Sequence, residues 1–414
     1  EKNREKVIEQ ATQIKDIFKK DQEKSSVINQ DLNTHLEAML NYVDFEWGGF
    51  KGSPKFPQFY VFESFLHFYK KNKNEKYYEA VKVLFANVCS RGLYDHLIGG
   101  IARYSTDDRW IAPHFEKMLY DNGQLVSLYS EAYLKFKNPI YKEVVFESLE
   151  FIERELLDKT GAFYSALDAD SEGEEGKFYI WKEDELRLLI KDNYHIFKDY
   201  FNINNNGLWE HDNYILLRKK SKEEIAKKHM ISVINLETNI SEWKKILMSA
   251  RDKRTRPGLD DKSLTSWNAL MLKGYIDAYM AFGDKRHLDI ALKNANFIAD
   301  IQLQKDGKLF HSYKDGKSTI NGYLEDYSLT ISAFIRLYEA TFDEKWLQLS
   351  DKMMQYAIIH FYDNTSSMFY FTSDLDPMLV ARKMEINDNV IPASNSVIAN
   401  SLFDLAIILD NNYY

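Results

Sequence analysis

The chain has 414 residues, of which 45% are hydrophobic and 14% aromatic, and its formal net charge is −9. This length is ample for a large core, and the acidic balance without a basic tract interleaved with aromatics argues against a nucleic-acid partner. No apolar run approaches the roughly 20 residues that a membrane span needs. The single cysteine, Cys89, excludes an internal disulfide and a CxxC redox pair. We therefore expect a cytoplasmic protein without a membrane partner.

Apolar residues at helical spacing predict amphipathic helices along most of the chain. Five short strand patterns, "AFYSAL", "KFYIW", "NYILLR", "KLFHSY" and "MFYFTS", each follow a turn that contains Gly or Asn. The expected helices cover residues 3–19, 29–43, 58–71, 75–91, 115–136, 138–157, 183–192, 264–282, 284–303, 325–341, 343–361 and 394–410.

A weak internal repeat runs through these helices. A polar turn followed by aromatic or apolar residues closes several of them, in "WGGFKG" (47–52), "KTGAFYS" (159–165), "KDGKLFHS" (305–312) and "SSMFYFTS" (366–373). Helix pairs that recur every 50–60 residues or so are typical of a closed ring of helical hairpins. The repeat stops at about 193–260, a polar stretch that we interpret as an insertion with a small hairpin and one helix opened by a capping box, Ser221 to Glu224. We expect one domain over residues 1–414.

The segment 168–175 carries an unusual density of acidic side chains. Its spacing resembles the start of an EF-hand calcium loop, but the position of the bidentate Glu holds Tyr179 and the flanks are strand-like, so an EF-hand is rejected. A cation site of another kind stays open, and so do two further interpretations. The carboxylates could serve catalysis with one raised pKa, or the segment could be a solvated hairpin tip. Because aromatic residues flank it, we expect the loop to be anchored on the core and to face a central funnel rather than to form a surface tip.

Residues 94–125 combine several groups suited to a pocket. His96 and His114 flank a Gly-rich turn, with Arg103, Arg109 and Trp110 between them. Histidine titrates near neutrality, Arg binds planar oxygen pairs and Trp offers a face to a sugar ring. The structural alternative is a loop in which His114 caps the next helix.

Three further stretches offer candidate residues with equally plausible structural roles. "GGFKGSPKFP" (48–57) reads as a rigid connection, "RTRPGLDDKSLTSWN" (254–268) as a helix entry, and "GYLEDYS" (322–328) as a first helical turn whose acids suit the helix dipole.

Together with "PASNSVIAN" (392–400), these stretches resemble the family of thioredoxin-domain-containing, spermatogenesis-associated proteins, in which a thioredoxin-like domain precedes a six-hairpin toroid. The resemblance covers residues 48–400 and implies an all-α fold, an (α/α)6 toroid of helical hairpins with short β-hairpins. That toroid is similar to those of N-acylglucosamine 2-epimerases, cellobiose epimerases and six-hairpin glycosidases. The thioredoxin-like domain has no counterpart here, the chain starts without Met, and family members continue past Tyr414, so we expect a fragment whose toroid is incomplete at its C-terminal end.

The resemblance leaves two functions open. The first is a sugar-directed enzyme: either an epimerase or isomerase, in which His96 and His114 act as base and acid beside a carbonyl while an arginine stabilises the enediolate, or a hydrolase with two carboxylates. The second is a non-catalytic toroid that binds a sugar or a protein for the thioredoxin-like domain. No cofactor and no metal are expected. The candidate catalytic residues are His96, His114, Asp168, Asp170, Glu325 and Asp326, and the candidate substrate-binding residues are Arg103, Trp110, Glu172, Trp181, Arg256, Asp261, Trp267 and Asn268.

Ring geometry gives one further expectation, since loops at one end of successive hairpins point to the same funnel. We predict that His114, Asp168, Asp170, Trp267 and Glu325 share one cavity, with a carboxylate near His114 setting its tautomer.

Overall fold

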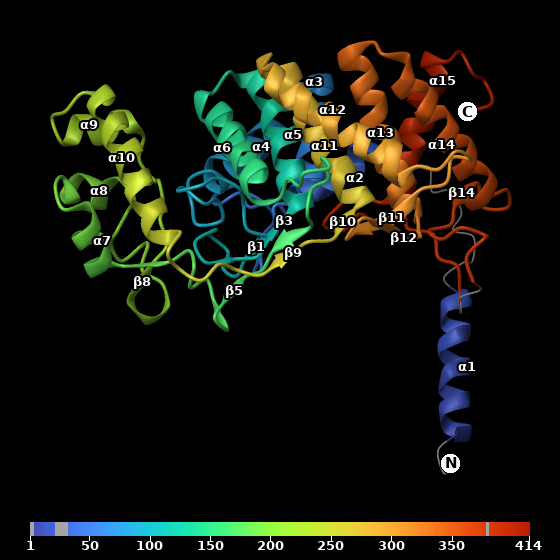
Figure 1. Ribbon diagram of the computed structural model, residues 1–414, viewed down its shortest axis with the longest axis horizontal. Helices are drawn as coiled ribbons and strands as arrows, with labels where there is room; N and C mark the ends of the chain where they lie inside the picture. The colour runs from blue at the N-terminus through green and yellow to red at the C-terminus, as the bar shows by residue number, and fades with distance from the viewer. Residues whose placement is uncertain (1–3, 21–31, 378–380) are drawn as a thin grey trace. The chain divides into compact units, whose positions relative to one another are not determined.

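The computed structural model describes residues 4–20, 32–377 and 381–414, and the chain divides into two compact units. The central unit is Ala38–Phe297, and the terminal unit combines Glu1–Glu37 with Ile298–Tyr414. Each unit is built from helices and very short strands, and each is described by itself (Figure 1).

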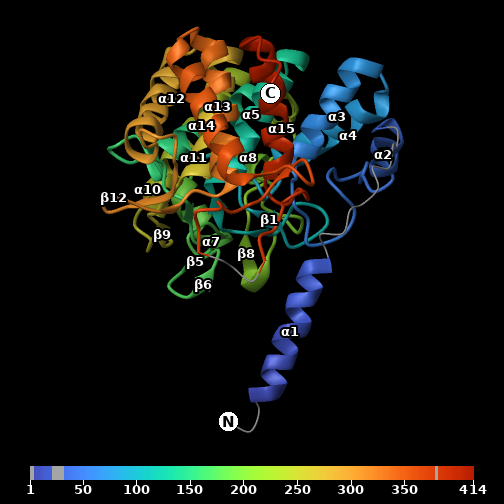
Figure 2. The same ribbon diagram turned by 90° about the vertical axis from the view of Figure 1, so that its right-hand side faces the viewer.

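The terminal unit contains α1 (Arg4–Lys20), α13 (Leu324–Thr341), α14 (Glu344–Phe361), α15 (Ser394–Ile408) and a π-helical turn (Ile298–Gln302). Its strands are β11 (Phe310–Lys314) and β12 (Lys317–Asn321), which form a hairpin, and the short pair β13 (Tyr362–Asp363) and β14 (Met368–Phe369). The helix α13 packs against both α14 and α15, and the three lie side by side in Figure 2. The helix α2 (Leu32–Leu40) crosses the boundary between the units.

The central unit holds three helix pairs, and in each pair the second helix follows the first after a short turn. The pairs are α3 (Phe59–Asn72) with α4 (Glu75–Val88), α5 (Leu119–Phe136) with α6 (Pro139–Glu155), and α11 (Thr265–Phe282) with α12 (Lys285–Phe297). The helix α5 also packs along α11. Its short strands are β1 (Tyr104–Ser105), β2 (Pro113–His114), β3 (Lys117–Met118), β4 (Ala166–Leu167), β5 (Asp170–Ser171), β6 (Glu174–Glu175), β7 (Trp181–Lys182), β8 (Asn213–Tyr214), β9 (Leu259–Asp260) and β10 (Ser263–Leu264).

The helix ends follow from local chemistry. The side chains of Asn74, Asn138 and Asp343 accept hydrogen bonds from backbone N–H groups in the first turns of α4, α6 and α14. Pro139 occupies the first turn of α6, where its missing N–H costs nothing, and Gly283 ends α11 in the left-handed conformation. These signals explain why each expected helix outside 193–260 appears within a few residues of its predicted ends.

The internal repeat has a defined structure. After α2, α6, α14 and the π-helical turn, the polar turn closes with an antiparallel backbone bridge: Val43 with Phe50, Leu157 with Phe163, Tyr362 with Phe369, and Leu303 with Leu309. A fifth such bridge, Tyr94 with Ile101, was not recognised in the sequence. The repeat is thus one structural unit, a helix followed by a bridged turn that leads to the next helix.

An asparagine in the first turn of a later helix clamps three of these bridges. Asn268 accepts a hydrogen bond from the N–H of Phe163 at 2.8 Å and donates to its C=O at 3.0 Å. Asn122 makes the same pair of contacts with Ile101, at 2.9 and 3.4 Å, and Asn395 with Phe369, at 2.9 Å each. Each clamp satisfies buried backbone groups that no strand partner reaches.

Between α6 and α11 the chain makes one long excursion, residues 168–258. Its ends are fixed because β4 pairs antiparallel with β9, Ala166 opposite Asp260 and Leu167 opposite Leu259. The expected insertion at about 193–260 lies almost entirely inside this excursion. The predicted capping box, Ser221 with Glu224, is confirmed at the start of the helix α9 (Lys222–Lys228). Beyond the expected helices, the excursion also contains α8 and the long α10. Its helices are α7 (Glu183–Ile190), α8 (Tyr194–Tyr200), α9 (Lys222–Lys228) and α10 (Val233–Arg251), with a 3-10 turn at Glu210–Asp212.

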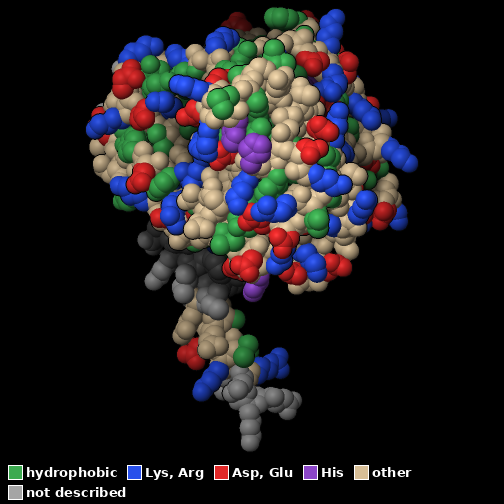
Figure 3. Space-filling model, turned by 90° about the vertical axis from the view of Figure 1, so that its left-hand side faces the viewer, with side chains coloured by type: hydrophobic (Ala, Val, Ile, Leu, Met, Phe, Trp, Pro, Cys, Tyr) green, Lys and Arg blue, Asp and Glu red, His purple; other side chains and the backbone are tan. Residues whose placement is uncertain are grey.

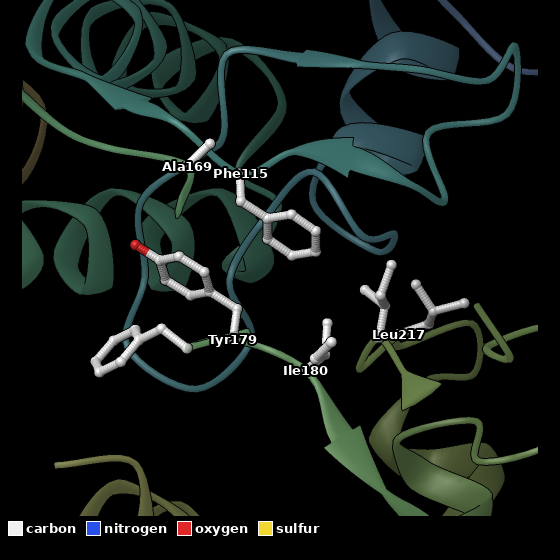
Figure 4. Close-up of a cluster of buried hydrophobic side chains, with 7 residues drawn as sticks. Phe115, Ala169, Tyr179, Ile180 and Leu217 are labelled. Carbon is white, nitrogen blue, oxygen red and sulfur yellow. The ribbon is translucent and has the colours of Figure 1, made fainter. Parts of the chain in front are cut away.

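The four helices of the excursion lie together, on the side of α6 (Figure 1). Ion pairs such as Lys198 with Glu183 and Lys222 with Glu237 cross its surface, and Lys, Arg, Asp and Glu side chains are interspersed on the face shown in Figure 3. Underneath, the excursion is packed on the central unit by a buried cluster (Figure 4). That cluster comprises Phe115, Ala169, Phe178, Tyr179, Ile180, Ile215 and Leu217.

Among the helices that the structure describes, none combines the length and apolar character needed to cross a bilayer.

Candidate functional site

The segment from β2 to β3 is the axis of the candidate site. Its side chains alternate, with Phe115 and Lys117 buried on one side and His114 and Glu116 half-exposed on the other. This is the period of an extended chain, whose successive side chains point to opposite faces. Phe115 fixes the register, because its ring stacks on Tyr179 at 5.5 Å inside the buried cluster (Figure 4). The sequence therefore presents His114 and Glu116 together on the accessible side.

His114 is held on that side by a carboxylate and an aromatic ring. Its Nδ1 lies 2.7 Å from Oε1 of Glu175, and its ring stacks on Tyr104, its cross-strand partner, at 4.8 Å. When Glu175 is ionised it accepts the Nδ1 proton, which leaves Nε2 of the neutral ring as a proton acceptor. Nε2 points toward Glu116, 3.7 Å from its Oε2. The predicted carboxylate near His114 is present, and it comes from the acidic segment.

Arg103 meets His114 at the same oxygen. Nη1 of Arg103 lies 3.3 Å from Oε2 of Glu116, the atom that Nε2 of His114 also faces. Nε of Arg103 donates to the hydroxyl of Tyr120 at 3.1 Å, and the ring of Tyr120 packs edge-on against Trp267 at 4.8 Å. Four partly exposed side chains, His114, Glu116, Arg103 and Trp267, thus lie on one surface, and the buried Tyr120 connects Arg103 to Trp267. This surface offers a proton acceptor, a guanidinium and one aromatic ring.

Asp121 follows Tyr120 in the first turn of α5 and is buried. Burial raises the pKa of its carboxyl group well above the ordinary value, Glu116 raises it further, and Arg103 offsets only part of the effect. Its Oδ2 has no hydrogen-bond partner among the described residues. A carboxylic acid that prefers its neutral form therefore lies directly beneath the surface formed by Arg103, Glu116 and Tyr120.

The opposite side of the segment faces a small cavity of about 30 Å³. Lys117 Nζ and Arg251 Nη1 each lie 2.9 Å from Oδ2 of Asp95, so two cations share one carboxylate in the interior. Burial, only partly offset by Asp95, lowers the pKa of Lys117 to about 8. Burial alone would raise the pKa of Asp95, but the charges of Arg251 and Lys117 hold it below its ordinary value.

His96 lines this cavity and not the accessible side. It is buried, its Nε2 lies 2.9 Å from the carbonyl oxygen of Arg91, and burial lowers its pKa well below the ordinary value. The structure therefore separates His96 and His114, which the sequence suggested as an acid–base pair, by the β2–β3 segment itself.

Several other predicted residues have structural contacts. Trp110 is buried, and its Nε1 donates to the carbonyl of Trp47 at 2.8 Å. Trp181 is buried beneath the guanidinium of Arg254, whose carbon lies 4.0 Å from the ring centroid. Asn268 is buried in its clamp. These three side chains offer no free face or amide to a ligand.

The acidic segment is a surface hairpin, with β5 paired to β6 and Glu172 at the tip. Asp168, Asp170 and Glu172 are all exposed, so the expectation that this loop is not a surface tip is wrong. Lys177 compensates part of the charge, at 3.2 Å from Glu172. The expected aromatic anchoring is confirmed, because residues 178–180 are buried immediately after the hairpin.

The remaining candidates lie elsewhere. Arg256 is half-exposed and pairs with Glu155, and Asp261 is half-buried just before β10. Glu325 and Asp326 begin α13 in the terminal unit, where Asp326 is buried and lies 2.9 Å from Nδ1 of His311. Because they belong to a different unit, the cavity predicted to unite Glu325 with His114 stays a prediction.

Sequence reasoning missed Glu116, Tyr120, Asp121 and Glu175 as site residues. The strand-like alternation around Phe115 and the position of Tyr120 and Asp121 in the first turn of a helix were visible signals. The pairing of Glu175 with His114, 61 positions apart, was not.

The comparisons with known proteins agree with this fold. No family model matches the chain. It is 29% identical over 431 residues to an uncharacterised protein of Caenorhabditis elegans, covering 95% of this chain and 58% of that protein. It is 28% identical over 401 residues to spermatogenesis-associated protein 20 of Homo sapiens, covering 87% of this chain and 51% of that protein. The chain thus spans a little over half the length of these curated relatives.

Two solved structures resemble it. One is a GH76 alpha-mannanase of Bacteroides thetaiotaomicron, with a TM-score of 0.53, 14% identity and coverage of 94% of this chain and 81% of that one. The other is an unsaturated glucuronyl hydrolase specific for heparin, with a TM-score of 0.50, 11% identity and coverage of 86% and 76%. At such identities the likeness concerns the fold alone, and it confirms the expected fold class of helical hairpins, the (α/α)6 toroid.

Proposed function

Because the chain belongs to the spermatogenesis-associated protein 20-like family, whose names state no reaction, we propose a function from the chemistry of the site itself. We propose a sugar-directed enzyme that transfers a proton at the carbon next to a carbonyl group, with His114 as the base. The observation that carries the proposal is the convergence of His114 and Arg103 on one oxygen of Glu116, beside the partly exposed ring of Trp267, which packs on the buried Tyr120.

The roles follow from this geometry. Nε2 of His114 takes the proton from the carbon, and the electron pair of the C–H bond moves to the carbonyl oxygen, giving an enediolate. Arg103, oriented by the hydroxyl of Tyr120, donates hydrogen bonds to that oxygen, where the charge develops. The hydroxyl group on the deprotonated carbon gives its proton to the former carbonyl oxygen and becomes the new carbonyl. The protonated His114, stabilised by Glu175, returns its proton to the former carbonyl carbon. The ring of Trp267 supports the sugar chain.

One base suffices for this shift of a proton between adjacent carbons. Inversion at a single carbon needs a second acid on the other side of the substrate, the role suggested for His96. Since His96 is buried and holds a backbone carbonyl, the arrangement favours an aldose–ketose isomerase over a two-base epimerase.

A second candidate is a glycoside hydrolase, favoured by the raised pKa of Asp121. Asp121, which favours its neutral form, and the carboxyl group of Glu116 are the kind of pair that glycosidic bond cleavage uses, one to protonate the leaving oxygen and one to assist attack. The names of the two similar structures, a mannanase and a glucuronyl hydrolase, give this alternative its support.

A screen of reducing mono- and disaccharides in D₂O separates the two reactions. Isomerisation should replace the proton next to the carbonyl by deuterium, which proton NMR detects, whereas hydrolysis should release new reducing ends. We expect His114→Gln to lower deuterium incorporation by roughly 10²–10⁴-fold, the usual contribution of a general base. Glu172→Gln, on the exposed tip of the same hairpin that carries Glu175, is the matched control and should leave the rate unchanged.

Other results would overturn the proposal. If reducing ends appear and Asp121→Asn abolishes them while His114→Gln does not, the site is a hydrolase. If a saccharide binds, Trp267→Ala weakens binding and no saccharide turns over, the chain is a binding module.

A further inference from the structure

The terminal unit contains a cluster of ligating side chains of its own. His311 comes from β11, and Glu325 and Asp326 come from the first turn of α13. One imidazole nitrogen and one oxygen of each carboxylate all lie within 4.8 Å of one another. The three residues are therefore close enough to share one ion.

The cluster is held rigidly by its surroundings. Asp326 is buried, and its Oδ2 accepts a hydrogen bond from the N–H of Tyr323 at 2.8 Å. The ring of His311 packs against that of Tyr323 at 4.8 Å, and Tyr323 stacks on Phe371 at 5.1 Å. Because the hairpin β11–β12 and the start of α13 fix the side chains, an ion would meet a preformed pair of ligands.

The spacing of that pair indicates the coordination geometry. Nδ1 of His311 and Oδ2 of Asp326 are 2.9 Å apart. At a metal–ligand distance of about 2.1 Å, neighbouring ligands of an octahedron lie about 3.0 Å apart and those of a tetrahedron about 3.4 Å. The observed separation is that of an N–H···O hydrogen bond and lies closer to the octahedral than to the tetrahedral edge. A divalent ion would take the place of the proton and would need only a small shift of the two side chains.

We propose that His311, Glu325 and Asp326 bind a divalent first-row transition-metal ion with octahedral coordination. One imidazole and two carboxylates form the mixed nitrogen and oxygen set that such ions accept, whereas Ca²⁺ prefers six to eight oxygens. Three protein ligands leave about three of the six positions for water or for oxygens of a ligand. This site is independent of the proton-transfer function proposed above.

A cluster with similar ligands in the central unit, between α3 and α5, serves as an internal comparison. Glu63 and His67 on α3 and Glu131 on α5 also lie within 4.8 Å of one another. There, however, Lys70 pairs with Glu131, Lys273 lies 3.8 Å from Glu63, and His67 is more than half exposed. Lysines already neutralise these carboxylates and His67 is largely exposed, so this cluster carries no proposal. We place the ion at His311 because Asp326 beside it is buried and the His311 ring packs against Tyr323.

The test is a titration of the metal-stripped full chain with Mn²⁺. Calorimetry measures the binding, and the melting temperature measures the stabilisation. We expect one ion per chain and a higher melting temperature with Mn²⁺. Glu325→Gln and His311→Gln should each weaken binding by at least about tenfold. Glu131→Gln, which changes the α3–α5 cluster, should bind Mn²⁺ as the unchanged chain does. Circular dichroism without metal establishes that each variant is folded. If Glu325→Gln does not fold, the binding measured for His311→Gln tests the proposal.

Three results would overturn the proposal. The first is the absence of Mn²⁺ binding at millimolar concentration. The second is binding that is lost in Glu131→Gln but kept in Glu325→Gln and His311→Gln. The third is stabilisation by Zn²⁺ but not by Mn²⁺, which would contradict octahedral coordination.

Discussion

At the scale of single residues, the central unit places ionisable groups with opposite tendencies on the two sides of one extended segment. Asp121, below the accessible side, favours its neutral form, whereas Asp95, on the cavity side, is held ionised by Arg251 and Lys117. The difference comes from partners and not from depth, because both carboxyl groups are largely buried. Two predictions follow from these groups.

Asp121→Asn should change how stability depends on pH. A raised pKa in the folded state gives stability that is complete below the ordinary pKa near 4 and is lost as pH rises toward the folded value. The unfolding free energy of the unchanged chain, relative to Asp121→Asn, should therefore fall from pH 4 upward, by at most about 1.4 kcal/mol per pH unit. Urea unfolding at several pH values measures this. A difference that stays constant or rises with pH would contradict the assignment, and Asp170→Asn on the exposed hairpin is the control.

Lys117→Met should destabilise the chain by about 3 kcal/mol, because it removes one member of a buried ion cluster and leaves Asp95 with a single cation. Since the pKa of Lys117 is lowered to about 8, its contribution to stability should also grow as pH rises from about 8 to 10.5. Lys177→Met, an exposed change, should shift the unfolding free energy by less than about 0.5 kcal/mol. A comparable loss in both variants would show that burial of Lys117 does not matter.

At the scale of elements, the repeated unit is a helix, a bridged turn and a clamping asparagine at the start of a later helix. The clamp has a physical reason, because a two-residue bridge leaves backbone groups in the core that need partners. In the repeat that precedes α13, the hydroxyl of Tyr327 accepts a hydrogen bond from the N–H of Leu309 at 2.9 Å. A different side chain thus meets the same need.

Asn268→Ala should therefore cost about 3 kcal/mol of unfolding free energy, since it leaves the buried N–H and C=O of Phe163 without partners at about 1–3 kcal/mol each. Asn122→Ala should cost a similar amount, and Asn206→Ala, in an exposed turn, less than about 0.5 kcal/mol. Chemical denaturation measures all three. A loss below about 1 kcal/mol for Asn268→Ala would show that water replaces the clamp.

At the scale of the whole molecule, the excursion 168–258 is part of the central unit and not an appendage. It leaves and returns through β4 and β9, its residues 178–180 and 215–217 bury Phe115, and its Arg251 reaches Asp95. The same contacts set the orientation of the β2–β3 segment and hence of His114.

Phe115→Ala should cost about 3–5 kcal/mol through the cavity it leaves, and it should loosen the excursion. Limited proteolysis should then give new cleavage sites within residues 168–258, while Met230→Ala, a highly exposed change, should keep the original pattern. New cleavage confined to residues outside the excursion would contradict this account of its anchoring.

The sequence by itself determined the elements of this protein. Helical periodicity, caps such as Asn138 and Ser221, and the recurring polar turns predicted the helices and their pairing, because these signals act over a few residues. Part of the site was also predictable: the stretch 94–125 contains His114 and Arg103, which the structure brings together.

Tertiary structure decided which side chains are free to act. His96, Trp110, Trp181 and Asn268 looked as suitable as their neighbours, yet packing commits them to the interior. The partner of His114, Glu175, comes from a hairpin whose place is set by burial of the aromatic residues that follow it. Local sequence fixes the conformation of a segment, but contacts between distant segments depend on how the hydrophobic surfaces of all elements are buried at once, and that is a property of the folded chain.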